Sequence, residues 1–421
     1  MTAVTSAAEL LDALATADDI EIDGTLSGMP AITLRPGTRL RGGTLRFGAR
    51  GIRLTSDNQL EDVTVIAPGT EVAIGTTAAD LGQLALRNVI TRGQVLLTSS
   101  RGHVEVDGLT VASADLRGRE ERPHGFGVDA MQGAFTLWNR SDAAGLTATL
   151  TGISAGAPGA PVRGSGVFVA GSVEVDLLRT GPVYTDGGIE PGTPDLISGG
   201  VYIITGAHVR TVINDGPVTT YGANDMALDN WGTVGSWTAR APITTHGPSG
   251  IGYVSFGTLD RLDVQAPITT HGDGARGFNV YDGHLASARF QRITTYGDGA
   301  VGVQVSKDLS LLEIVDDITT AGGAGQSLVR GVQVPRRAIA VSVEAGGRIG
   351  RLAFGGSLRT DGDDVVTLEA AGTVGELTGG QIIARGVGSD AVRVSGSGSV
   401  GSLDSVTVTG PVRREETVEV S

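Results

Sequence analysis

The chain has 421 residues, of which 66 are glycine, 40% are hydrophobic and only 4% are aromatic, and its formal net charge is -14. This charge argues against a nucleic-acid-binding protein, because Lys and Arg must neutralise the phosphates. Cysteine is absent, which excludes disulfides and thiolate metal sites. No run of about 18 apolar residues occurs, so the sequence predicts no membrane-spanning helix.

The first residues have neither the basic n-region nor the apolar h-region of a signal peptide, so we expect a cytoplasmic protein. Residues 6–17 then predict a short helix, with Ser6 as the N-cap and Glu9 completing a capping box. Its predicted apolar face holds Leu10, Leu11 and Leu14. It is the one helix that the pattern predicts.

Residues 20–48 alternate apolar and polar residues in short runs broken by Gly and Pro, which is typical of short strands and turns. A helix followed by such strands resembles the start of the pectate-lyase-like right-handed parallel β-helices, in which a helix plugs the open end of the first coil. The resemblance covers about the first 45 residues. It implies a cap helix and first coil over residues 1–45 and a parallel β-helix over residues 46–421.

Five related phrases recur every 25 residues: GPVTTYG, APITTHG, APITTHG, QRITTYG and DDITTAG, which place Val218, Ile243, Ile268, Ile293 and Ile318 at equal intervals. A period of this length marks a solenoid whose repeats stack as coils. Strand alternation turns Ile268 and Thr270 inward and Thr269 and His271 outward. The sequence therefore predicts an all-β, right-handed, single-stranded parallel β-helix with a short N-terminal capping helix. The phrases GPVTTYG, NDMALDNWG and GFNVYDG are also similar to those of a group of bacterial β-helix proteins of unassigned role, which implies a fold and no activity.

Three stretches break the period, near residues 117–160, 181–198 and 325–346, and the last makes the step from Ile318 to Leu358 forty residues. Departures from a repeat usually map to loops on one face, often the binding face. We therefore expect these stretches to form side walls of a groove.

Aromatic residues concentrate in the repeats, where nine of the 17 in the chain fall between Tyr221 and Tyr296. Tyr221, His246, His271 and Tyr296 occupy one outward position of successive coils, and Trp231, Phe256 and Tyr281 occupy the position thirteen residues after the repeated Val or Ile. Exposed rings along a groove suit sugars, whose C–H faces pack on aromatic rings. The alternative is that the rings only stabilise the stack or lie in the core, and both readings stay open.

The phrase NDMALDNWG, residues 224–232, places two carboxylates, Asp225 and Asp229, where other coils have small residues. Glycosidic hydrolysis uses a pair of carboxylates, so these two are acid/base candidates, and solvated turn caps are the alternative. Further catalytic candidates are Asp195, His246 and His271. The substrate-binding candidates are Tyr221, Asn224, Asn230, Trp231, Arg276, Asn279, Tyr281, Tyr296 and Trp138.

Familiar signatures of β-helix enzymes are otherwise missing. The run TDGDDV resembles the Asp-Asp element of polygalacturonase-type hydrolases, but the accompanying elements of that family do not occur. We predict no cofactor and no metal. The predicted function is a carbohydrate-active protein that holds an oligo- or polysaccharide in a groove on the side of the β-helix, with hydrolase, lyase or transferase chemistry left open. The alternative is a non-catalytic structural or adhesive rod, and the predicted assembly is a homo-oligomer, namely a trimer.

Overall fold

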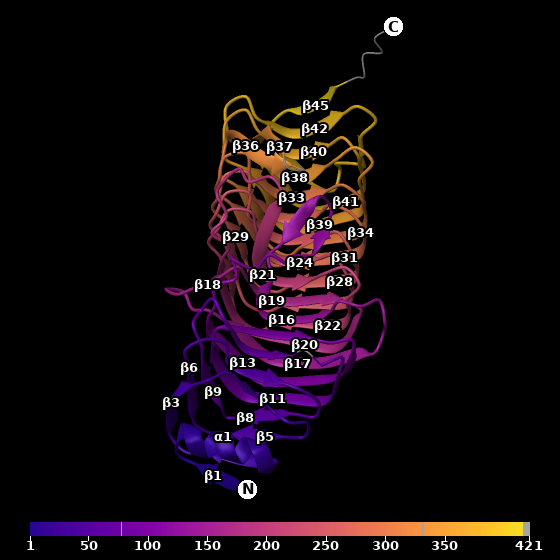
Figure 1. The fold of residues 1–421 in the computed structure, drawn as a ribbon. Coiled ribbons are helices and arrows are strands. Elements are labelled where there is room, and N and C mark those ends of the chain that lie inside the picture. The colour runs from indigo at the N-terminus through magenta and orange to yellow at the C-terminus, as the bar shows by residue number, and fades with distance from the viewer. Residues whose placement is uncertain (77, 330–331, 416–421) are drawn as a thin grey trace. The chain divides into compact units, whose positions relative to one another are not determined.

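The computed structural model describes residues 1–76, 78–329 and 332–415. Strands in these residues pair in parallel with strands one coil away, and one helix is present among them, so the chain is a parallel β-helix, as predicted (Figure 1). In this described part, no helix has the length and apolar character that a membrane span requires.

The chain divides into two compact units. The first comprises Met1–Pro123, Ala130–Gly188 and Gly200–Gly216, and the second comprises His124–Asp129, Ile189–Gly199 and Pro217–Ser421. The elements of the first unit are β1 (Thr2–Val4), α1 (Ala7–Thr16), β2 (Asp19–Ile22), β3 (Thr25–Met29), β4 (Ile32–Thr33), β5 (Arg39–Arg41), β6 (Thr44–Phe47), β7 (Ile52–Leu54), β8 (Gln59–Glu61), β9 (Thr64–Ile66), β10 (Val72–Thr76), β11 (Asp80–Arg92), β12 (Gln94–Thr98), β13 (Arg101–Ser113), β16 (Gly133–Asn139), β17 (Leu146–Ala155), β18 (Val162–Arg163), β19 (Ser165–Gly171), β20 (Val173–Asp186) and β22 (His208–Asn214).

Two strands, β15 (Val128–Ala130) and β21 (Leu196–Ile203), have residues in both units. The remaining strands, in the second unit, are β14 (His124–Gly125), β23 (Val218–Thr220), β24 (Asp225–Asn230), β25 (Thr233–Ala239), β26 (Ile243–Thr245), β27 (Ile251–Ser255), β28 (Thr258–Val264), β29 (Ile268–Thr270), β30 (Arg276–Val280), β31 (His284–Phe290), β32 (Ile293–Thr295), β33 (Val301–Val305), β34 (Asp308–Ile314), β35 (Ile318–Thr320), β36 (Ala324–Val329), β37 (Val332–Arg337), β38 (Ile339–Val343), β39 (Arg348–Thr360), β40 (Val366–Ala370), β41 (Thr373–Ala384), β42 (Asp390–Ser395), β43 (Ser399–Val400), β44 (Thr407–Thr409) and β45 (Val412–Glu415).

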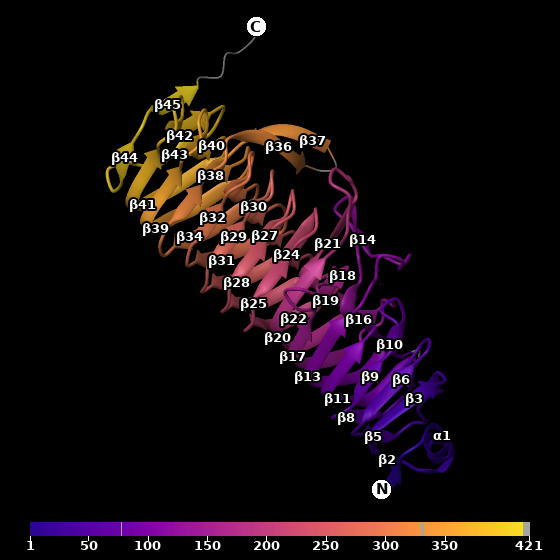
Figure 2. The ribbon, with the colours of Figure 1, turned by 90° about the vertical axis from the view of Figure 1, so that its left-hand side faces the viewer.

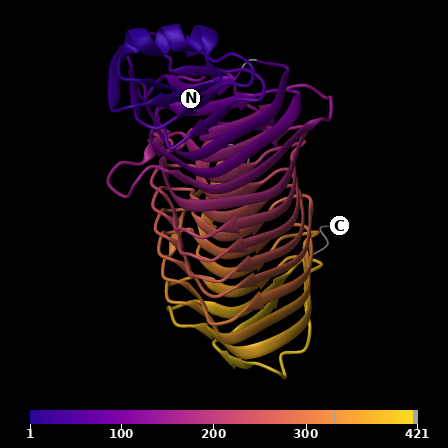
Figure 3. The same ribbon diagram turned by 90° about the horizontal axis from the view of Figure 1, so that it is seen from below.

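The helix α1 lies at the N-terminal end of the first unit, beside the first coils (Figure 3). The Ser6 hydroxyl accepts a hydrogen bond from the Glu9 N–H at 3.3 Å and so satisfies one orphan donor of the first turn, and the Glu9 carboxylate accepts a hydrogen bond at 2.7 Å from the N–H of Thr5, the residue before the N-cap. Leu10 and Leu14 are buried, but Leu11 is 43% exposed, so its predicted place on the buried face is wrong. The reason is geometric, because residues four apart share a helix face whereas adjacent residues do not.

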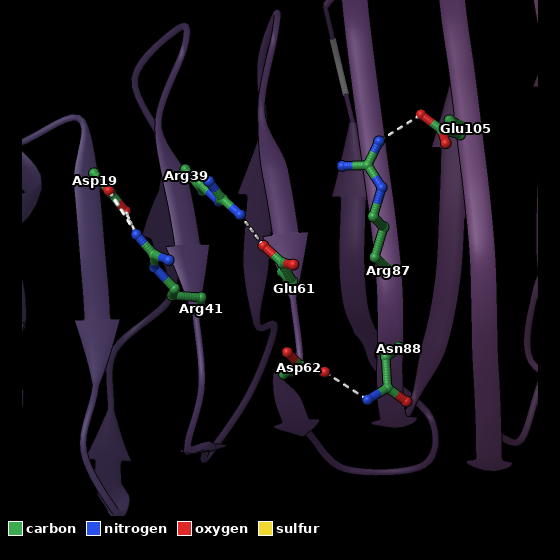
Figure 4. A network of polar contacts seen from close by, with 8 residues as sticks. All are labelled: Asp19, Arg39, Arg41, Glu61, Asp62, Arg87, Asn88 and Glu105. Atoms are coloured by element: carbon green, nitrogen blue, oxygen red, sulfur yellow. Dashed lines mark hydrogen bonds and ion pairs between the residues drawn. The ribbon is translucent and has the colours of Figure 1, made fainter. Parts of the chain in front are cut away.

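Charged side chains on the outside of the first unit bridge successive coils (Figure 4). Asp19 on β2 pairs with Arg41 on β5 at 2.6 Å, and Arg87 on β11 pairs with Glu105 on β13 at 2.6 Å. Such half-exposed pairs stabilise a protein by only about 0–1 kcal/mol each. Their alternating signs nevertheless favour one register between neighbouring coils, because like charges placed opposite each other are destabilising.

The 25-residue repeats of the second unit stack in register. Val218 pairs with Ile243, Ile243 with Ile268, Ile268 with Ile293, and Ile293 with Ile318, and all five side chains are at most 1% exposed. Each coil has three strands, such as β29, β30 and β31. Ile268 and Thr270 are buried and His271 is exposed, which confirms the predicted inward and outward sides.

The aperiodic stretches are partly regular. The predicted loop near residues 117–160 contains β16 and β17, which pair with β19 and β13, so its irregular part is narrower than expected. The stretch near residues 325–346 contains the antiparallel hairpin β36–β37, which stands out from the coils of the second unit (Figure 2), and residues 330–331 lie outside the described residues. Ile318 pairs with Leu358, which confirms the forty-residue step.

Candidate functional site

Four rings form an outward ladder at the ends of β23, β26, β29 and β32. Tyr221, His246, His271 and Tyr296 stack with ring centroids 5.1, 5.0 and 5.1 Å apart and planes within 6° of parallel. His246, His271 and Tyr296 are exposed and Tyr221 is half-buried. Because each inner ring has its faces covered by its neighbours, the ladder presents ring edges to solvent, with their polar nitrogen and hydroxyl groups.

The imidazole of His246, within this ladder, is neutral near pH 7. Partial burial lowers the pKa of the His246 imidazole, and the charge of the neighbouring His271 lowers that pKa further. A neutral imidazole offers one donor and one acceptor, which suits a hydroxyl-rich ligand. In the described ranges, no group of three or more His, Cys, Asp or Glu side chains is placed to hold a metal ion.

A second aromatic cluster lies where β24, β27 and β30 end. Phe256 stacks on Phe126 at 4.6 Å and packs against Tyr281 at 5.0 Å, while Trp231 meets Phe126 edge-on at 5.4 Å. Phe126 sits at the tip of the β14–β15 hairpin with φ of 53°, a left-handed conformation that is costly for a bulky residue. The hairpin tip is therefore held in a strained geometry that places an aromatic ring over the coils.

Three of these aromatic residues, Phe126, Phe256 and Tyr281, line a small chamber on the outer face of the second unit's coils. The floor is made by Met226, Ile251 and Val254, and the roof includes Phe126, Ile197 and Leu328, one residue from each aperiodic stretch. The volume is about 80 Å³. The predicted convergence of the aperiodic stretches on one face is thus found here, although the chamber is far smaller than the roughly 300–1,000 Å³ of typical ligand pockets.

Asp229 lies in this chamber and is fully buried. Burial raises the pKa of its carboxyl group well above the ordinary 3.8, and the nearby Trp231 indole offsets only part of that rise. The indole N–H does not reach normal hydrogen-bond geometry, and no described residue donates a hydrogen bond to either carboxylate oxygen. Asn279, which also lines the chamber, is 1% exposed and is likewise without a partner among the described residues.

Asp225 has a different environment, although it lies on the same strand. Its carboxylate accepts a hydrogen bond from the Ser198 hydroxyl and another from the Gly222 N–H at 2.8 Å, and it is fully buried. Asp229 is four positions further along the strand, which is about 13 Å at about 3.3 Å per residue. The carboxyl pairs of glycosidases are about 5–9.5 Å apart, so this arrangement does not resemble such a pair.

Arg276 is 3% exposed and anchors the hairpin β36–β37 to the coils. Its guanidinium donates to the Gln304 side chain at 2.8 Å and to the Ser327 hydroxyl at 3.0 Å. Burial, and then the charge of Arg336, lower its pKa to about 10, so it remains cationic at neutral pH. Its described contacts hold a wall in place.

A larger cleft of about 280 Å³ adjoins the chamber and shares Asn224 and Ser249 with it. One wall is Pro191 and Gly192, and the other is Gln326 and Gln333 of the hairpin β36–β37. The floor consists of coil turns, including Asp273. These turns directly follow the ring ladder, since Asp273 is two residues after His271.

Left-handed turn residues fix both walls. Asn224 (φ 56°) donates from its side-chain amide to the carbonyls of Thr193 and Leu196, at 2.8 and 3.2 Å, and so holds the wall of residues 189–199. At the equivalent position two coils on, Gly274 has φ 63°, and a Cβ there would lie 2.5 Å from the Gln326 carbonyl oxygen. The hairpin can approach this turn closely because the residue is glycine.

The other predicted site residues are dispersed. Asn230 is fully buried and donates to the Thr258 carbonyl at 3.1 Å, and Asp195 is exposed on the wall segment. Trp138 belongs to the first unit, where the Arg140 guanidinium lies 4.7 Å from its ring centre. The structure therefore brings together Asn224, Asp229, Arg276, Asn279 and Tyr281, with Trp231 beside them, and places the ring ladder at the adjoining turn.

The sequence reasoning missed Phe126, Ser249, Asp273, Gln326 and Gln333 as parts of the site. For Phe126, Gln326 and Gln333 the one available signal was their position inside aperiodic stretches. Comparison of the chain with protein-family models, with curated proteins and with solved structures found no match.

Proposed function

We propose that the second unit binds an oligo- or polysaccharide in the cleft between Pro191 and Gln333 and along the edges of the ring ladder. The observation that carries the proposal is the cleft itself, which is open, lies between two walls, and is lined by the exposed polar side chains of Asp273, Gln326 and Gln333. Amides, hydroxyls and carboxylates at such a surface exchange hydrogen bonds with sugar hydroxyl groups.

The ring ladder also supports a sugar ligand, through hydrogen bonds at the ring edges rather than through the expected packing of sugars on the ring faces. Sugar C–H faces cannot pack on the faces of His246 and His271, because neighbouring rings cover them. The ring edges instead present polar atoms at intervals of 5.0–5.1 Å. Successive units of an extended polysaccharide repeat at a comparable distance, so one chain can meet several rungs.

We propose binding without hydrolysis by Asp225 and Asp229. The Asp225 carboxylate is engaged by Ser198 and Gly222, and Asp229 lies in a chamber too small for a sugar ring with its leaving group. A non-catalytic rod is the second candidate, favoured by the in-register ring stack. In that case the rings and turns only stabilise the coils.

A binding assay separates the two. The purified protein is applied to a glycan array and the strongest ligand is titrated calorimetrically into wild type, Gln326→Ala, Gln333→Ala and the control Gln381→Ala, which removes an exposed amide on β41. Loss of about one hydrogen bond predicts roughly five- to tenfold weaker binding for the two cleft variants and unchanged binding for the control. Absence of any glycan binding by the folded protein would favour the rod. Sugar products that disappear in Asp229→Asn would contradict binding without turnover.

We further propose that the chain belongs with the right-handed, pectin-lyase-like solenoids. The capping helix beside the first coils and the three-strand coils support this. The expected homotrimer stays a prediction, which sedimentation equilibrium would test.

A further inference from the structure

A second concave surface lies in the first unit, on the outer side of β4, β7, β10 and β12. It is a groove of about 400 Å³, within the roughly 300–1,000 Å³ range of small-molecule pockets. Ile32, Ile52, Val72 and Leu96 contribute apolar surface to it. Gly75 pairs with Arg53 on one side and Leu96 on the other, and a Cβ there would lie only 2.9 Å from Val72 Cγ1, so glycine lets the Val72 side chain lie close against this strand.

Three arginines, Arg50, Arg53 and Arg119, line this groove, in a chain whose net charge is -14. Arg50 lies 3.8 Å from Glu71. Neither Arg53 nor Arg119 takes part in an ion pair with any described residue. The residues that line the groove include three arginines and no carboxylate, so the groove keeps an excess of positive charge.

A hydrogen bond to the backbone fixes the position of the Arg119 guanidinium. The guanidinium donates to the Thr70 carbonyl at 3.1 Å, and its Nε is buried without a partner among the described residues. Burial lowers the pKa of Arg119; the charge of Glu71 raises that pKa, and the charge of Arg50, the smallest of the three effects, lowers it. An anion bound in the groove attracts the partly buried Arg119 guanidinium and supplies an acceptor for its unpartnered Nε.

We infer that this groove binds a small amphipathic anion, with a carboxylate or phosphate group held by the arginines and an apolar body lying against Ile52, Val72 and Leu96. The planar guanidinium fork matches both anionic groups. The apolar lining supplies affinity by removing the body of the ligand from water. The groove lies in the first unit, so this inference does not depend on the proposed sugar cleft.

The test uses four probes of similar size or charge with the full-length protein: benzoate, phenyl phosphate, the uncharged benzamide and inorganic phosphate. Binding is followed by calorimetry in wild type, Arg53→Gln, Arg119→Gln and the control Arg46→Gln, which removes an exposed arginine of β6 outside the groove. We expect benzoate or phenyl phosphate to bind about tenfold or more tightly than benzamide and inorganic phosphate, and the tighter of the two identifies the anionic group. Each groove variant should weaken this binding about tenfold, and the control should not.

Several results would overturn the inference: no binding of either aromatic anion at millimolar concentration, equal binding of benzamide, or equal loss in Arg46→Gln. If Arg119→Gln fails to fold, Arg53→Gln decides alone, since Arg53 is exposed on its strand.

Discussion

Replacing Asp229 by Asn should make the protein more stable, and the gain should grow with pH. The carboxyl group is fully buried and has no hydrogen-bond donor among the described residues, and burial raises its pKa well above 3.8. In the unfolded chain the same group titrates near 3.9. Between these two pKa values the folded state holds a proton that the unfolded state has released.

The direction in which the unfolding free energy changes with pH follows from this difference in the number of bound protons. When the folded state binds more protons, the free energy of unfolding falls as pH rises, by about 1.4 kcal/mol per pH unit for one full proton. The fall begins near the ordinary aspartate pKa and ends at the raised pKa of the folded protein. The side-chain amide of the Asp229→Asn variant cannot ionise, so the variant lacks this loss while keeping nearly the same side-chain volume.

The assay is urea unfolding of wild type and Asp229→Asn at pH 5, 6, 7 and 8. The difference in unfolding free energy, variant minus wild type, should rise with a slope approaching about 1.4 kcal/mol per pH unit and then level off. Asp260→Asn, at an exposed position on β28, serves as the control and should give a flat difference. A flat difference for Asp229→Asn as well, or a variant less stable than wild type at pH 8, would refute the buried, unpartnered carboxyl.

Three further changes test the surroundings of the site. Gly274→Ala places a Cβ 2.5 Å from the Gln326 carbonyl oxygen and should lower the melting temperature and weaken glycan binding. The control Gly346→Ala has a similar positive φ and no neighbour within 4 Å, so it should lose only the roughly 1–2 kcal/mol of backbone strain. Equal effects of the two substitutions would mean that the hairpin does not approach the turn. His246→Gln should reduce the fall in unfolding free energy between pH 7 and pH 5. Burial lowers the pKa of His246 in the folded protein, so as the pH falls the unfolded chain takes up this proton first. Melting temperatures that fall equally with acid in both proteins would contradict this. Phe126→Asn introduces a residue that tolerates the left-handed conformation of this turn and removes the aromatic ring that covers Trp231. Tryptophan emission should shift to the red, and acrylamide quenching should increase. Unchanged quenching would place Phe126 away from Trp231.

The repeat spacing predicted the coil register correctly, because a fixed period and strand alternation are properties of neighbouring residues. Ile243 and Ile268 pair as the 25-residue interval requires, and the ring ladder faces outward. The capping box at Ser6 was also readable, whereas Leu11 was assigned to the wrong side of a ten-residue helix.

The burial and the hydrogen-bond partners of the site residues could not be predicted from the repeat spacing. Asp229 points outward from its strand and is buried all the same, because Phe126, Ile197 and Leu328 come from stretches without any period and cover it. Nothing in the spacing of Asp225 and Asp229 shows that Ser198 engages one and leaves the other unpartnered. Contacts between aperiodic segments and coils depend on tertiary packing, which a repeat does not encode.

Hydrogen exchange measured with and without a pooled library of neutral and acidic oligosaccharides tests sugar binding in the cleft most directly. We expect slower exchange in the wall of residues 189–195, in the turns near residues 222–224, 247–250 and 272–274, and in residues 324–329 of the hairpin. Unchanged exchange in all of these segments, or slowing confined to other parts of the chain, would contradict it.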